Sequence, residues 1–120
     1  MIIYHTSRSG RKIAEIEQGS PVISEAGGML DIMVNAGYND CNGIIIHSDG
    51  LHNDFFDLRT GMAGEILQKF SNYRMRLAIV GDFTAIKSKS LRDFIMESNR
   101  RGTICFVASS EEALSKLDRE

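Results

Sequence analysis

Three short apolar runs, each with the composition of a strand buried on both faces, constrain the fold of this 120-residue chain most strongly. They cover residues 43–47, 77–80 and 104–107, and the first contains three consecutive isoleucines. A continuous apolar run of this length is typical of a strand inside a parallel sheet, because such a sheet is covered on both of its faces. Segments with one-sided helical patterns separate the runs. This alternation favours an α/β domain with right-handed crossovers.

The helical segments are recognised by apolar residues spaced three and four apart, which fall on one face of a helix. They are expected at about residues 24–36, from residue 54 or 57 to residue 72, at about residues 88–99, and after Ser109.

Two further strands are predicted near the N-terminus, at residues 1–6 and 11–17. The dipeptide of Ser9 and Gly10 between them is a turn signal, which indicates an antiparallel hairpin. The predicted order is therefore β-β-α-β-α-β-α-β-α. It gives one α/β domain over residues 1–120, with a mixed, mainly parallel sheet of about five strands and with four helices.

Charge and cysteine usage narrow the class of protein. The formal net charge is −2, so the chain lacks the basic balance that proteins binding nucleic acid usually show, and no nucleic-acid partner is expected. Cys41 and Cys105 form no motif, which favours reduced thiols and a cytoplasmic location. No stretch approaches the roughly 20 apolar residues of a spanning helix, and the apolar start is too short for a secretory signal. No membrane association is therefore expected.

The segment from Phe55 to Met62 carries a resemblance to a known family. It reads Phe-Phe-Asp-Leu-Arg-Thr-Gly-Met and is similar to the pattern of STAS (anti-sigma-factor antagonist) domains, in which an apolar pair and Asp precede Ser-Ser or Ser-Thr and then Gly-Leu. This chain has one extra residue after Asp57, and Arg59 replaces a small hydroxyl residue. The order of elements also resembles the STAS fold, so this resemblance implies a STAS-like architecture.

A second resemblance covers most of the chain. Four stretches look like a bacterial family of small proteins of unknown function, and this resemblance implies a bacterial source but no activity. The stretches are residues 54–57, 63–70, 78–83 and 88–95.

The STAS resemblance implies a switch at Thr60, because the matching hydroxyl in that family is phosphorylated by a partner kinase, which abolishes partner binding. A helix N-terminus accommodates added negative charge, Arg59 adds a cation and Asp57 opposes the phosphoryl group. The alternative is that Thr60 is an ordinary residue at the start of a helix, and that Gly61 allows close packing.

A polar loop after the first buried run is a candidate ligand site. His47, Asp49, His52 and Asp54 follow the strand at the edge where parallel sheets usually bind ligands. Imidazoles and carboxylates can hold Zn²⁺ or Fe²⁺, but the spacing matches no known motif. His47 can equally end the strand with a hydrogen-bonded ring, and Asp54 can cap a helix. No metal or cofactor is therefore assigned.

Two further segments that contain basic residues are candidate binding surfaces, with less support from their sequence patterns. Gly81, Asp82 and Phe83, followed by residues 87–90, resemble a phosphate-contacting turn but lack the spaced glycines of a P-loop. Arg92, Arg100 and Arg101 suit a helix end, where cations favour the dipole, or a partner surface.

These patterns favour a regulatory module that binds an unidentified protein partner. Its expected contact surface comprises residues 48–53, 57–60 and 81–90. The alternative is an enzyme or small-ligand binder that uses His47, Asp49 and His52. Self-association through a sheet edge, at the hairpin or at residues 104–107, leaves both a monomer and a homodimer open.

Overall fold

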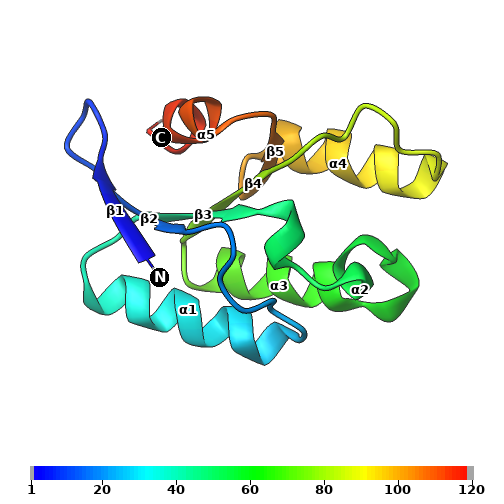
Figure 1. Ribbon diagram of the computed structural model, residues 1–120, viewed down its shortest axis with the longest axis horizontal. Coiled ribbons are helices and arrows are strands. Elements are labelled where there is room, and N and C mark those ends of the chain that lie inside the picture. Colours follow the sequence, from blue (N-terminus) through cyan, green and yellow to red (C-terminus); the bar gives the residue numbers. More distant parts are fainter. Residues whose placement is uncertain (1, 119–120) are drawn as a thin grey trace.

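The computed structural model describes residues 2–118 and contains one five-stranded sheet (Figure 1). The strands lie side by side in the order β1-β2-β3-β4-β5, with β1 antiparallel to β2 and all other pairs parallel. The predicted mixed, mainly parallel sheet is confirmed, as is the order of elements. The strands are β1 (Ile2–Thr6), β2 (Lys12–Ile16), β3 (Gly43–His47), β4 (Arg76–Val80) and β5 (Ile104–Val107).

The helices are divided unequally between the two faces of the sheet (Figure 1). α1 and α3 cover one face, α4 packs along β5 at the edge, and α5 covers the other face. Each right-handed crossover leads to the next strand on the same side, so the helices of these crossovers lie on the same face of the sheet. α5 follows the last strand and belongs to no crossover, so it is free to cover the other face. The helices are α1 (Ala26–Tyr38), α2 (Asn53–Phe56), α3 (Met62–Asn72), α4 (Lys89–Arg101) and α5 (Ser110–Leu117).

The central strands are buried on both faces, as predicted. In β3, Ile44 and Ile46 pack into the core shared with α1 and α3, while Ile45 packs into the core under α5. All three side chains are at most 1% exposed. Within residues 2–118, no helix is long and apolar enough to cross a membrane.

The second predicted helix is broken into three pieces. α2 ends before Asp57, a single 3-10 turn spans Leu58–Thr60, and α3 begins after Gly61. Asp57 has an extended backbone (φ −99°, ψ 99°), and Gly61 adopts the left-handed conformation (φ 79°, ψ −4°). A left-handed residue cannot continue a helix, so residues 2–118 contain five α-helices where the sequence predicted four.

Side chains cap several of the helix starts. Ser88 Oγ accepts a hydrogen bond from the Leu91 N–H (3.2 Å), so Ser88 caps α4. Ser109 Oγ caps α5 by accepting from the Glu112 N–H (3.1 Å), at the start of the helix predicted after Ser109. Asp54 does not cap α2, because His52 Nδ1 accepts from its N–H at 3.0 Å.

The outer edge of β5 is covered by side chains from the flanking helices. The Phe106 N–H donates to Asn99 Oδ1 (2.7 Å), and the Ala108 N–H donates to Glu112 Oε1 (2.8 Å). Satisfied N–H groups make poor templates for another strand. Self-association through this edge is therefore disfavoured.

Gly61 provides a test of the break between α2 and α3. A Cβ at Gly61 would meet nothing within 4 Å, so the Gly61→Ala variant creates no steric clash with other residues. Its effect on stability therefore measures the free energy needed to hold an alanine in the left-handed backbone conformation. We expect it to lower the free energy of unfolding by about 1–2 kcal/mol. Gly64 lies inside α3 with similar open space, and Gly64→Ala should raise stability by about 0.5–1 kcal/mol. Urea denaturation of both variants checks this; equal effects would contradict the assigned backbone.

Candidate functional site

The most unusual polar group in the fold is Glu15, a carboxylate on β2 that is only 7% exposed. Glu15 Oε1 lies 2.7 Å from His5 Nε2, and Glu15 Oε2 lies 2.7 Å from His47 Nε2 and 3.1 Å from Ser110 Oγ. We call these four residues the Glu15 cluster. It joins β1, β2, β3 and the first turn of α5.

The register of the sheet explains why these residues meet. Ile13 and Glu15 alternate with Ala14 and Ile16, so their side chains point to the α5 face. The β1–β2 hairpin pairs His5 with Ile13 and thereby places His5 on that face. His47 ends β3 on the same face, two residues beyond Ile45.

The hydrogen bonds keep Glu15 ionised. Burial raises the pKa of Glu15, but hydrogen bonds from His47, His5 and Ser110 outweigh it and leave the pKa below its usual value. Because an ionised carboxylate only accepts, both imidazoles donate from Nε2. A carboxylate that orients an imidazole is a common catalytic pair, but here the hydroxyl of Ser110 also bonds to the carboxylate and not to an imidazole. The cluster therefore holds three strands and a helix together.

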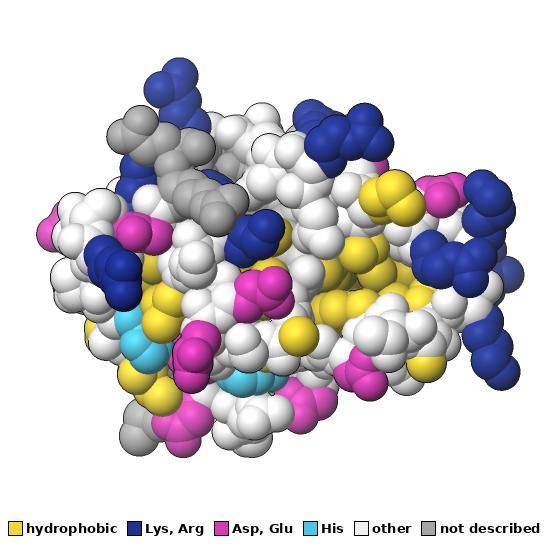
Figure 2. Space-filling view, turned by 90° about the horizontal axis from the view of Figure 1, so that it is seen from above, with side chains coloured by type: hydrophobic (Ala, Val, Ile, Leu, Met, Phe, Trp, Pro, Cys, Tyr) yellow, Lys and Arg dark blue, Asp and Glu magenta, His cyan; other side chains and the backbone are white. Residues whose placement is uncertain are grey.

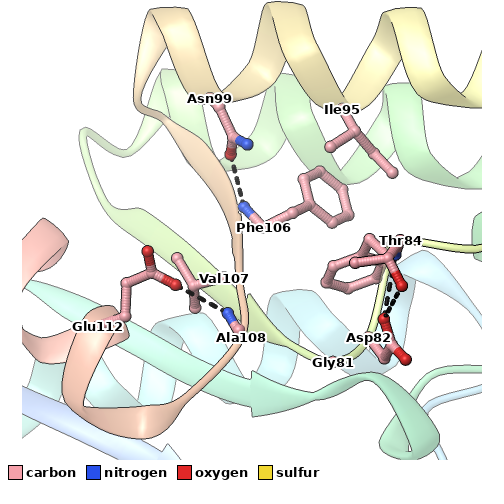
Figure 3. Close-up of a pocket in the computed structure, with 10 residues that line it drawn as sticks. Gly81, Asp82, Thr84, Ile95, Asn99, Phe106, Val107, Ala108 and Glu112 are labelled. Carbon is pink, nitrogen blue, oxygen red and sulfur yellow. Dashed lines mark hydrogen bonds between the residues drawn. The ribbon is translucent and has the colours of Figure 1, made fainter.

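A cavity of about 420 Å³ opens beside the carboxyl ends of β4 and β5 (Figure 3). We call it the carboxyl-edge cavity. It lies between α4, the turn after β4 and the first turn of α5, where ligands usually bind in parallel α/β sheets. Its lining residues are Gly81, Asp82, Phe83, Thr84, Ile95, Asn99, Phe106, Val107, Ala108 and Glu112.

The walls of this cavity are largely apolar, and its charged side chains are acidic. Phe83 packs edge to face on Phe106, with ring centroids 5.2 Å apart, and Ile95 projects from α4. Asp82 accepts from Thr84 Oγ1 (2.6 Å) and the Thr84 N–H (3.0 Å), and these hydrogen bonds lower the pKa of Asp82. Among the described lining residues, Asp82 and Glu112 carry charge and none is Lys or Arg. Figure 2, seen from the α5 side, shows a hydrophobic hollow with both acidic and basic side chains near its margin.

A close approach shapes the floor of the cavity. A Cβ at Gly81 would lie 2.5 Å from Ser48 Oγ and 3.0 Å from Phe83 Cζ. Only glycine therefore fits where the turn after β4 passes the turn after β3. This contact also connects the cavity with the neighbourhood of His47.

The four residues of the candidate ligand site, His47, Asp49, His52 and Asp54, do not gather at one point, and most of them bond to different partners. His47 belongs to the Glu15 cluster, Asp49 Oδ2 accepts from Gln18 Nε2 (3.4 Å), and His52 caps α2. Asp54 is exposed and lies 3.5 Å from His52 Nδ1. Within residues 2–118, no group of three or more His, Cys, Asp or Glu side chains is placed to hold a metal ion.

Thr60 is an exposed residue whose hydroxyl organises the start of α3. Thr60 Oγ1 lies 2.6 Å from Asp54 O and 2.9 Å from Asp57 O, and it also accepts from the Met62 N–H (3.3 Å). Arg59 forms a two-pronged pair with Asp57, with Nε and Nη2 each 3.0 Å from a carboxylate oxygen. Beside it, Gly61 supplies the left-handed residue that ends the 3-10 turn.

Sequence reasoning missed Glu15. One signal was available: a single carboxylate inside a strand whose inward side chains are otherwise apolar must find partners, since an unpaired buried charge is very unfavourable. The hydrogen-bond partners of Glu15 lie 10, 32 and 95 positions away in the sequence, so local residue spacing could not identify them.

The fold and these sites define a mixed α/β domain with a polar cluster and an open cavity at the carboxyl edge of its sheet. Residues 8–117 match the family described as "Domain of unknown function (DUF4180)", and the chain belongs to this family. The predicted membership in a family of unknown function is confirmed, whereas the STAS resemblance stays a prediction. No curated protein and no solved structure matches the chain.

The Glu15 cluster predicts a specific response to acid. Since the folded pKa of Glu15 is depressed, its stabilisation is full above the unfolded pKa and is lost as pH falls through the folded value. Glu15→Gln should lower the free energy of unfolding at neutral pH by about 1–3 kcal/mol and flatten the acid limb of the stability curve. Chemical denaturation across acidic and neutral pH measures both effects. Glu17→Gln is the matched control, because Glu17 is exposed; a similar loss in both variants would contradict this role.

Proposed function

We propose that the chain is a non-enzymatic binding module that recognises a protein partner through the carboxyl-edge cavity. The observation that carries the proposal is an open apolar hollow with a carboxylate on either side of it (Figure 3). Concave apolar surfaces with a few convergent polar groups are the usual recognition sites of such domains. The turn from Gly81 to Thr84 belongs to the contact surface expected from the sequence.

The residues that line the cavity suit a partner of a particular chemistry. Phe83, Ile95 and Phe106 offer an apolar surface, and burial of a partner's apolar side chain there is favourable. Asp82 and Glu112 add negative charge without a lining cation to neutralise it. The expected partner therefore presents an apolar side chain next to a lysine or arginine.

A small organic cation is the second candidate for the same cavity. The observation that favours it is the volume of about 420 Å³, which lies within the usual range for small-molecule sites. A reaction centred on His47, Asp49 and His52 has less support, because their side chains are held by Glu15, Gln18 and the α2 backbone.

The cavity is tested with Thr84→Arg, which places a bulky cation at an exposed position of its lining. Affinity capture from the source organism with the wild-type chain, followed by calorimetry with each purified candidate, should give a partner whose affinity this variant lowers at least about tenfold, or about 1.4 kcal/mol. Ser71→Arg, with the same charge change on an exposed residue of α3, is the control and should bind normally.

Two results would overturn this proposal. Equal binding by both variants of every captured protein would place recognition elsewhere. Native mass spectrometry that finds a small cation, released by Thr84→Arg, would favour the second candidate in place of the protein partner.

The phosphorylation switch at Thr60 is a separable part of the proposed function. Modification would remove the proton that Thr60 Oγ1 donates to the Asp54 and Asp57 carbonyls, and would add charge beside the Asp57 carboxylate. Thr60→Asp should therefore weaken the partner complex several-fold in calorimetry, while the uncharged Thr60→Asn should retain most of the affinity. An unchanged complex with Thr60→Asp, or equal losses with both variants, would count against a charge-driven switch.

A further inference from the structure

A second pocket, of about 340 Å³, lies at the opposite edge of the sheet, where β4 and β5 begin. We call it the basic pocket. The residues that line it come from the ends of α4 and α5 and from the starts of both strands. They are Arg76, Asn99, Arg100, Arg101, Gly102, Thr103 and Lys116.

The fold brings cations from three elements into this pocket. Arg100 and Arg101 end α4, which stops at Gly102 in the left-handed conformation (φ 87°). Arg76 opens β4, and its Nε donates to Gly102 O at 2.9 Å, which fixes its guanidinium beside the end of α4. Lys116 lies in the last turn of α5 and is half-buried.

The charge of this pocket stands out against the rest of the chain. Four of its described lining residues are cationic and none is Asp or Glu, although the chain as a whole has a net charge of −2. Arg100 pairs with Glu97 at 3.2 Å, but both side chains are more than half exposed, so this pair is weak. In residues 2–118, no ion pair involves Arg101 or Lys116.

Helix dipoles account for only part of this arrangement. A cation in the last turn of a helix is favoured by a partial charge of about −0.5 at the helix end. That explains Arg100 and Arg101 on α4 and Lys116 on α5 separately, but not why two helix ends and Arg76 converge on one concave surface. Two partial charges of this size amount to about −1, whereas Arg101 and Lys116, which form no ion pair within residues 2–118, already carry two positive charges.

We propose that the basic pocket binds a small ligand bearing a phosphate or diphosphate group. Arginine guanidinium groups present planar pairs of donors that match phosphate oxygens, and Lys116 adds a point charge. The Asn99 side-chain amide and the Thr103 hydroxyl line the same space and can donate to further oxygens. Asn99 also lines the carboxyl-edge cavity, but none of the four cations does, so this proposal does not depend on the proposed function.

Calorimetric titration of the intact chain with pyrophosphate at low ionic strength tests this site. The double variant Arg101→Gln and Lys116→Gln should weaken pyrophosphate binding at least about tenfold, which corresponds to about 1.4 kcal/mol. The double variant Lys87→Gln and Lys89→Gln removes the same charge around the start of α4 and should change the affinity less than about twofold. All four substituted side chains are at least partly exposed, so both variants should fold, and thermal unfolding checks this.

Three other outcomes of these titrations would support or overturn the proposed phosphate site. ADP that binds more tightly than pyrophosphate, with the same loss in the Arg101 and Lys116 variant, would support the site and add a nucleotide base to the ligand. Equal weakening in both double variants would show unspecific attraction and overturn the proposal. Binding of an oligonucleotide but not of pyrophosphate or ADP would also overturn it, in favour of a nucleic-acid surface.

Discussion

The stability of the fold depends on how the sheet face opposite α1 and α3 is covered. All three crossovers step in the same direction, so α1, α3 and α4 contribute to one core, and in residues 2–118 the opposite face is covered by α5 alone. Ala113 and Leu117 of α5 bury Ile45 and Ala78 there. Without α5, the central strands would expose a continuous apolar surface, which soluble domains avoid.

The same short helix takes part in the Glu15 cluster, the carboxyl-edge cavity and the basic pocket. Ser110, in its first turn, bonds to Glu15; Glu112 lines the carboxyl-edge cavity; and Lys116, in its last turn, lines the basic pocket. An eight-residue helix is about 12 Å long, so it connects the two edges of the sheet with little room to adjust. Displacement of α5 would therefore disturb both pockets together with the core under it.

Glu15 shows how a buried charge is made compatible with this core. An isolated carboxylate in an apolar environment would be protonated, but two imidazoles and a hydroxyl satisfy both of its oxygens. Because its donors come from β1, β3 and α5, the ionised group also favours one arrangement of these elements over others. Removal of either imidazole would leave part of the charge uncompensated, which is more damaging than the small net gain of one hydrogen bond suggests.

The sequence by itself determined the strands, their order and the alternation of helices, because hydrophobic periodicity is local. The run at Ile104–Val107 and the start of a helix after Ser109 could be read from neighbouring residues. Only the tertiary structure decided that Asp57 and Gly61 break the second helix, since a capped 3-10 turn competes there with a continuous apolar stripe. It also decided the meeting of Glu15 with Ser110, and of Arg76 with Lys116, because strand pairing and the packing of α5 bring together residues that no local spacing connects.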